Sequence, residues 1–250
     1  MKWLDYLTGQ RPAPPIDDAL WREALARCPA LERLSEAERQ QLRELAAGFL
    51  KHKRFHPIDI HLDDAQRLLI AIQACIPIRH MGLRVLRDWR TVIVYPGEFR
   101  VRRDQIDDAG LVSEDHQILA GEAWPKGPLV LSWGTVEHSL SQPWDGHNVI
   151  AHEIAHKLDM RNGPPDGLPV LPRHIKQQTW IDTFQAAYER LIEAMHRGEY
   201  IDIDHYAATN PSEYFAVASE MHFSAPDRLR DAEPGVAQLL HDYYGPSPAP

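Results

Sequence analysis

Apolar residues recur at helical spacing along most of the chain. Near the N-terminus this pattern runs from about Asp18 to Lys53, with leucines and alanines repeating every three or four positions. Within it, Ser35 and Glu38 stand in the order of a capping box, so a helix is expected to begin after Ser35. The same periodicity predicts later helices at about residues 63–76, 148–160, 176–195, 211–223 and 235–244.

A β-type pattern occupies the middle of the chain. Thr91–Tyr95 is rich in β-branched residues and is followed by a Pro-Gly turn, which is typical of a strand that ends there. Phe99–Val101 and Pro128–Trp133 have the same character. The order of elements predicts a helix-rich α+β fold with a small central β-sheet.

The two ends of the chain differ from its body. Arg11–Pro15 reads RPAPP, and the last residues read GPSPAP. Proline at this density favours extended backbone over helix or sheet. We therefore expect an extended N-terminal segment over 1–16, one domain over 17–245 and a loose Pro-rich tail over 246–250. Within the domain we expect a helical N-terminal lobe over about 17–90 and a catalytic part over about 91–245.

Composition narrows the class of protein. The 250 residues carry a net charge of -9 and no basic stripe, so a nucleic-acid partner is not expected. No apolar run approaches the roughly 18 residues of a membrane span, and no signal peptide is expected at the N-terminus. Only two cysteines occur, Cys28 and Cys75, far apart in the sequence. This usage favours a reducing, cytoplasmic location.

The segment that carries chemistry contains His152, Glu153 and His156 in the order HExxH. On a helix, positions four apart share one face, so both imidazoles can bind one Zn²⁺. The glutamate would then reach a water molecule on the metal and act as general base. Fourteen histidines raise the chance of a random match to roughly a few per cent, so the motif alone is a hypothesis.

The context of the motif favours the metal site. Ile150, Ile154 and Leu158 follow at intervals of four and would bury one side of the helix. The histidines beside this stripe would then lie at the edge of the core and face a cleft. The alternative is an ordinary histidine pair, either on the surface or bonded to the neighbouring glutamate.

A third ligand is needed, because a catalytic zinc usually has three protein ligands. The extended HExxHxxGxxH pattern would need glycine where Asp159 stands and histidine where Asn162 stands, so a downstream glutamate is the remaining common solution. The predicted helix that begins at Asn210 offers Glu213 and Glu220. Glu213 is only slightly favoured, since it could merely cap the helix and Glu220 lies on the same face.

Asp159 itself follows His156 by three residues. It could accept a hydrogen bond from the proton-bearing nitrogen of a ligand histidine, or it could be an exposed aspartate at a helix end.

Two longer segments resemble a known family. HEIAHKLDMRNG and DHYAATNPSEYFAVASEMHFSAP are similar to the Mlc titration factor A family of bacterial zinc peptidases, and more distantly to the catalytic domain of anthrax lethal factor. The likeness covers about residues 17–245. It implies a zincin-like, gluzincin-type fold with one Zn²⁺ per chain, held by His152, His156 and Glu213.

The resemblance also implies roles for other residues. Glu153 would be the general base, and Tyr206 would stabilise the oxyanion of the tetrahedral intermediate. Aminopeptidase-type cleavage would be expected, together with binding of the glucose repressor Mlc, which relieves repression of sugar-transport genes.

Three interpretations remain open. The first is zinc-dependent peptide hydrolysis, with the strand Pro128–Trp133 pairing with an extended peptide substrate. The second is a non-catalytic protein that sequesters a transcriptional repressor. Glu153 favours the first, because a purely structural zinc needs no base. The third is a helical protein with an incidental histidine cluster.

Overall fold

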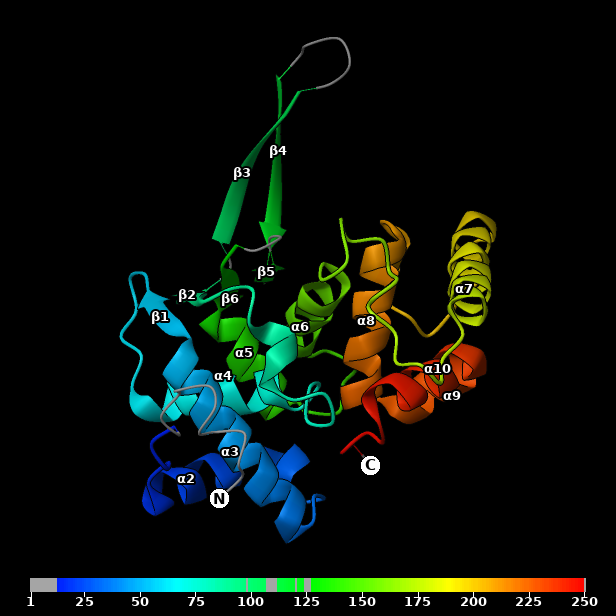
Figure 1. Cartoon of the computed structure of the whole chain (residues 1–250). Coiled ribbons are helices and arrows are strands. Elements are labelled where there is room, and N and C mark those ends of the chain that lie inside the picture. The colour runs from blue at the N-terminus through cyan, green and yellow to red at the C-terminus, as the bar shows by residue number, and fades with distance from the viewer. Residues whose placement is uncertain (1–12, 98, 107–111, 120, 124–126, 250) are drawn as a thin grey trace.

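The structure is a computed structural model that describes residues 13–97, 99–106, 112–119, 121–123 and 127–249. Helices make up most of it, and Figure 1 shows their arrangement. The helices are α2 (Asp18–Arg27), α3 (Glu36–His52), α4 (Asp64–Cys75), α5 (Trp133–Ser141), α6 (Val149–Asp159), α7 (Gln177–Arg197), α8 (Pro211–Ser224), α9 (Pro226–Ala232) and α10 (Pro234–Tyr244). Three short 3-10 helices are η1 (Pro29–Leu31), η2 (Leu83–Leu86) and η3 (His205–Ala208).

The strands form a small sheet and a separate hairpin. The sheet has the order β1-β2-β6-β5, from β1 (Arg54–Pro57), β2 (Thr91–Tyr95), β6 (Leu129–Ser132) and β5 (Gly121–Ala123). The first three are parallel and β5 is antiparallel to β6. β3 (Phe99–Ile106) and β4 (Val112–Leu119) form the antiparallel hairpin that projects from the body in Figure 1. The expected α+β plan with a small sheet is confirmed.

The position of β6 corrects one expectation. It pairs with β2 on one side and with β5 on the other, so no free edge is left for an added peptide strand. Its four residues are all buried, as the continuous apolar run Leu-Val-Leu requires in the interior of a sheet. Pairing of the strand Pro128–Trp133 with substrate is therefore excluded.

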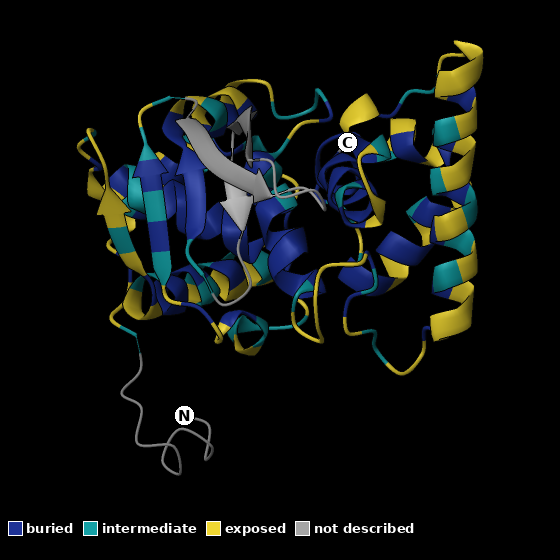
Figure 2. Ribbon diagram, turned by 90° about the horizontal axis from the view of Figure 1, so that it is seen from above, coloured by how far each residue is buried: buried dark blue, intermediate teal, exposed yellow. Residues whose placement is uncertain are grey.

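Helices α6 and α8 pack against each other at the centre of the molecule, between the sheet side and the α7–α10 side (Figure 1). α8 is buried along nearly its whole length, whereas α7 exposes its outer face, as Figure 2 shows. On the inner face of α7, Trp180 stacks on Phe184 with ring centroids 4.4 Å apart. Phe184 in turn meets Phe215 of α8 edge to face, with centroids at 6.1 Å. The aromatic packing holds α8 in place from behind.

The predicted helix starts are confirmed at both capping positions. Ser35 Oγ accepts from the backbone N–H of Glu38, and the Glu38 carboxylate accepts from the backbone N–H of Ser35 at 2.8 Å. Asn210 Oδ1 accepts from the backbone N–H of Glu213 at 3.0 Å, with Pro211 in the first turn. Such caps satisfy backbone donors that a helix leaves unpaired at its start.

Two helices were not predicted. α5 begins at Trp133, where the sequence pattern predicted the end of a strand, because the Ser132 hydroxyl caps the new helix by accepting from the Thr135 N–H at 3.2 Å. α9 is a short helix that Pro226 starts directly after α8 ends. Among the described residues, no helix is long and apolar enough to cross a membrane.

The tail also differs from expectation. Pro248 and Ala249 are buried, and the buried guanidinium of Arg79 donates to the carbonyl of Pro246. His222 of α8 lies 3.1 Å from the carbonyl of Gly245 through its Nε2. Residues 246–249 therefore contact the body, with Pro248 and Ala249 buried and Pro246 exposed.

Candidate metal centre

Helix α6 fixes the two motif histidines. Asn148 caps it by accepting from the Ala151 N–H at 3.0 Å. The predicted stripe is in the core, since Ile150, Ile154 and Leu158 are each at most 1% exposed. With that face buried, His152 and His156 project one turn apart toward α8, and their rings lie 4.7 Å apart between centroids.

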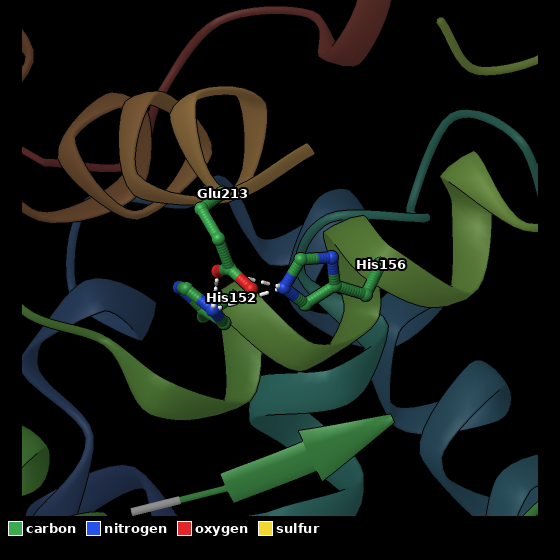
Figure 3. A group of neighbouring side chains, drawn as sticks. All are labelled: His152, His156 and Glu213. Carbon is green, nitrogen blue, oxygen red and sulfur yellow. Dashed lines mark hydrogen bonds and ion pairs between the residues drawn. The ribbon is translucent and has the colours of Figure 1, made fainter. Parts of the chain in front are cut away.

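Three side-chain atoms converge between α6 and α8, as Figure 3 shows. Nε2 of His152, Nε2 of His156 and Oε2 of Glu213 each lie 3.1 Å from the other two. Four ligands placed tetrahedrally at about 2.0–2.1 Å from zinc are about 3.3 Å apart. The triangle is close to that size, and it leaves the fourth position for water or substrate. These three residues therefore fit a divalent metal. In the described part of the chain, they form the group of possible ligands whose nitrogen and oxygen atoms lie close enough together to hold one ion.

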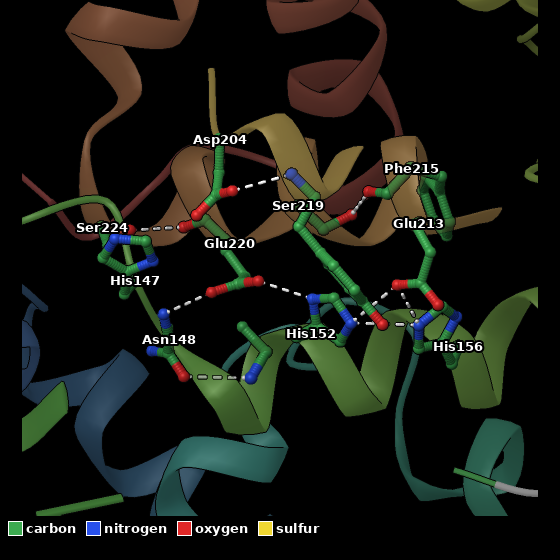
Figure 4. A network of polar contacts seen from close by, with 12 residues as sticks. His147, Asn148, His152, His156, Asp204, Glu213, Phe215, Ser219, Glu220 and Ser224 are labelled. Carbon is green, nitrogen blue, oxygen red and sulfur yellow. Dashed lines mark hydrogen bonds and ion pairs between the residues drawn. The ribbon is translucent and has the colours of Figure 1, made fainter. Parts of the chain in front are cut away.

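The structure separates the two glutamates that the sequence left in competition. Glu213 is the carboxylate of the cluster. Glu220, two helical turns further along α8, lies on the other side of the His152 ring, with Oε1 2.5 Å from Nδ1 (Figure 4). Its second oxygen accepts from the backbone N–H of Asn148 at 2.8 Å. One buried carboxylate thus orients a histidine and tethers the start of the helix that carries it.

The second histidine is oriented through a hydroxyl. His156 Nδ1 lies 3.1 Å from Ser212 Oγ, and Ser212 Oγ donates to Asp159 Oδ2 at 2.9 Å. The same oxygen of Asp159 accepts from the backbone N–H of Gly167 at 2.8 Å. Asp159 was expected to meet a ligand histidine directly or to be exposed. It is fully buried, and it contacts His156 only through the hydroxyl of Ser212.

A count of hydrogens assigns the tautomer of His156. Ser212 has one hydroxyl hydrogen, which it donates to the carboxylate of Asp159. Its oxygen can then only accept from His156, so Nδ1 carries the hydrogen and Nε2 keeps its lone pair for a metal. Glu220 has the same effect on His152, because a carboxylate accepts from Nδ1–H.

Electrostatics in the cluster follow from burial and close contact. Burial raises the pKa of Glu213, but the close contacts of its carboxylate with the imidazoles of His152 and His156 outweigh burial and hold that pKa well below its ordinary value. Burial lowers the pKa of His152, but the charge of Glu220 and the hydrogen bonds of Glu213 and Glu220 raise it well above the ordinary value. Both shifts have the same cause, which is the negative charge of Glu213 and Glu220 beside the imidazoles, and this charge also favours a bound cation.

Beside the cluster lies a cleft of about 700 Å³. His152 and Glu153 of α6 and Glu220 of α8 line one side of it. Tyr206 of η3 lines it as well, 43% exposed, with its ring centroid 6.2 Å from that of His152. The five residues predicted from the sequence for the site are thus brought to one place: the three cluster residues, Glu153 and Tyr206.

Ser212 and Gly167 were not identified from the sequence. The sequence held one signal for Ser212, because it directly precedes Glu213 in the first turn of the predicted helix. Gly167 has φ of +81°, and a Cβ there would lie 2.6 Å from the carbonyl oxygen of Pro211. Only glycine allows the loop to approach α8 so closely.

Comparison with known proteins agrees with this site. The model of a family described as glucose-regulated metallo-peptidase M90 matches residues 6–245. An uncharacterised protein of Synechocystis sp. is 38% identical over 248 residues, which are 97% of this chain and 89% of that protein. The protein named Mlc titration factor A of Escherichia fergusonii is 37% identical over 250 residues, or 98% and 91% of the two chains. Its namesake in Cronobacter sakazakii is 37% identical over 232 residues, or 91% and 86%. Since the family model and these relatives span nearly the whole chain, the resemblance seen in the sequence is confirmed, and the chain belongs to the M90 family of metallo-peptidases.

Proposed function

We propose that the chain is a zinc-dependent peptidase whose metal is held by His152, His156 and Glu213. The observation that carries the proposal is the 3.1 Å triangle of two imidazole nitrogens and one carboxylate oxygen beside a cleft. Two histidines with one glutamate are a donor set that suits catalytic zinc and leaves one position open. When bound, the ion acidifies water and polarises the scissile carbonyl.

Glu153 is proposed as the general base. It is 2% exposed and lines the cleft next to His152, so its carboxylate is available to a water molecule and shielded from bulk solvent. It takes a proton from the attacking water and delivers it to the nitrogen of the leaving amine. Both transfers occur at one carboxylate, which is why a single residue beside the histidines is sufficient.

Tyr206 is proposed as the donor to the oxyanion. Its side chain is half exposed at the wall of the cleft, close to His152, where a phenolic O–H can reach a substrate carbonyl. A donor aimed at the oxygen that gains charge in the transition state lowers the barrier more than the ground state.

The test of the proposal is Glu153→Ala, with Glu193→Gln on the exposed face of α7 as a control. Glu153→Ala is expected to lower kcat by about 10²–10⁴-fold on a chromogenic peptide substrate while one zinc per chain is still bound. Full activity in Glu153→Ala, or metal content near zero in the zinc-supplied wild type, would contradict it.

We propose that cleavage is of the aminopeptidase type, as the family resemblance implies. A peptide with a free N-terminus should then be cleaved at its first bond, and the N-acetylated peptide of the same sequence should not be cleaved there. Mass spectrometry of the products distinguishes this from internal cleavage, which would contradict the proposal.

A second proposed role is binding of a transcriptional repressor. It is supported by the name Mlc titration factor A carried by relatives that cover nearly the whole chain. Purified Mlc is the probe, and the Glu153→Ala variant should bind it as the wild type does if binding and hydrolysis are separate. If both the wild type and Glu153→Ala bind the repressor and neither cleaves any peptide, the chain would be a non-catalytic protein that sequesters the repressor.

We also propose a cytoplasmic location. Cys28 and Cys75 are free, buried thiols, and burial raises the pKa of the Cys28 thiol to about 12, so both stay protonated and unreactive. Cell fractionation followed by immunoblotting tests the location, and recovery outside the cytoplasm would contradict it.

A further inference from the structure

One guanidinium joins two segments that form the walls of the cleft. Arg228 lies on the short helix α9, and its Nε and Nη2 donate to the two carboxylate oxygens of Asp202, at 2.7 and 2.6 Å. Its Nη1 donates to the backbone carbonyl of Asp145 at 2.7 Å. Asp145 and Asp202 are 57 positions apart in sequence and both line the cleft, as does Arg228. The three hydrogen bonds thus span from one wall to the other.

On one side the contact leads to Tyr206. Asp202 stands four residues before it, in the segment 198–204 between α7 and η3. The hydroxyl of Tyr200 also donates to Asp202, at 2.9 Å. Asp204 caps η3 by accepting from the backbone N–H of Tyr206 at 2.8 Å. The segment is short and capped, so fixing Asp202 restricts where Tyr206 can lie.

On the other side the contact leads to the metal-binding helix. Asp145 lies in the loop that precedes α6, and its carboxylate accepts from the backbone N–H of His147 at 2.8 Å. Its other oxygen is 3.1 Å from Nε2 of His138 on α5. Asn148, the cap of α6, follows directly and is bound to Glu220. The loop that Arg228 holds is therefore continuous with the helix that carries His152.

A glycine makes room for the guanidinium. Gly146 has φ of +100°, and a Cβ at this position would lie 2.9 Å from Nη1 of Arg228. Both the backbone conformation and the close approach favour glycine here. The close approach of Gly146 to the guanidinium is a second observation, separate from the hydrogen bonds, that the loop and Arg228 fit each other.

We propose that Arg228 is a positioning residue of the peptidase, which sets the place of Tyr206 relative to the metal-binding helix. The proposal rests on the proposed function, since it gives Tyr206 its role. The contact is expected to add little to the free energy of folding, because the side chains of Arg228 and Asp202 are 45% and 34% exposed and exposed ion pairs contribute little. What a bidentate pair adds is a defined geometry.

The first experiment measures position without measuring activity. Arg228→Met removes the donors and keeps an unbranched side chain, and Arg230→Met is the matched control on the same helix, where Arg230 pairs only with Asp227 among the described residues. Hydrogen exchange followed by mass spectrometry should show at least about tenfold faster exchange over residues 199–206 in Arg228→Met and no change in Arg230→Met. Equal exchange in wild type and Arg228→Met would overturn the proposal.

The second experiment connects the position to the reaction. Arg228→Met should lower kcat by about 10–100-fold with KM changed less than threefold, because a misplaced group about 1 Å away loses much of its effect. In a Tyr206→Phe background, the same substitution should lower kcat by less than twofold. Full additivity of the two substitutions would overturn the proposal, since Arg228 would then act elsewhere.

Two further variants keep the result interpretable. Gly146→Ala displaces the guanidinium without removing any polar group and should reproduce faster exchange over 199–206, whereas unchanged exchange would count against the proposal. Arg228→Lys keeps the charge but loses the planar guanidinium that donates two hydrogen bonds to Asp202. Its kcat should therefore fall between that of the wild type and that of Arg228→Met. If the wild type hydrolyses no peptide, the proposed function fails, and the exchange experiment still decides whether Arg228 positions the segment.

Discussion

Glu220 gives the sharpest test of how the metal site is held. Its two oxygens accept from different donors, His152 Nδ1 at 2.5 Å and the Asn148 N–H at 2.8 Å. In Glu220→Gln the shape is kept, but one oxygen becomes an NH₂ group. Whichever way the amide turns, a donor then faces a donor, and the negative charge beside His152 is lost.

The magnitude follows from this geometry. Loss of an acceptor that orients a metal-binding histidine typically weakens metal affinity about 10–100-fold. This corresponds to about 1.4–2.7 kcal/mol of binding free energy. Glu220 is 9% exposed, so water cannot readily replace the missing acceptor.

The assay is a zinc competition titration against a chromophoric chelator, with Glu193→Gln as a matched control at an exposed site. Circular dichroism of the metal-free proteins shows whether the fold is kept. A zinc dissociation constant for Glu220→Gln within twofold of the wild-type value, in a folded protein, would refute the role given to Glu220.

The remaining predictions concern the second histidine and the core. Ser212→Ala takes a donor from the buried carboxylate of Asp159 and should lower the free energy of unfolding of the metal-free protein by about 1–3 kcal/mol, measured by urea denaturation; an unchanged midpoint would contradict the relay. Gly167→Ala forces a Cβ against the backbone of α8 at positive φ and should destabilise the protein, whereas Gly163→Ala, with open space at its Cβ, should have little effect on the melting temperature. Burial lowers the pKa of His222 to about 4, below its unfolded value near 6.5, so its contribution is fully present above pH 6.5 and is lost as the pH falls toward 4. The lost stability is at most about 3 kcal/mol, and in His222→Gln the unfolding free energy should depend less steeply on pH over that range.

The sequence predicted those parts of the molecule that local chemistry decides. The capping box at Ser35, the cap at Asn210 and the stripe on α6 depend on residues three or four apart, and the structure confirms each of them. The two histidines share a helix face for the same reason. Short-range rules are sufficient when both partners lie on one element.

The choice between Glu213 and Glu220 could not be made in this way. Both lie on the same face of α8, seven residues apart, and both contact His152. Only the alignment of α8 against α6 decides which carboxylate meets the Nε2 atoms and which meets Nδ1. That alignment depends on packing between segments some 60 residues apart, which a pattern of nearby residues does not contain.

Ser132 and Asp159 show two other limits. Ser132 is the last residue of β6 and also the cap of α5. A serine at this position is compatible with a strand that continues and with a helix that begins, so the sequence did not distinguish the two. Asp159 contacts His156 only through Ser212, which lies on another helix. The spacing of Asp159 and His156 in the sequence therefore could not predict the hydroxyl between them.

The triangle of donor atoms has a consequence for how the protein obtains its ion. In small zinc-binding modules the metal organises an otherwise unfolded chain, so its removal unfolds the protein. Here the donors lie on two packed helices, and the buried carboxylates of Glu220 and Asp159 fix the histidines through hydrogen bonds that do not involve the ion. Chelation should therefore yield an intact, inactive apoprotein that regains its ion without refolding.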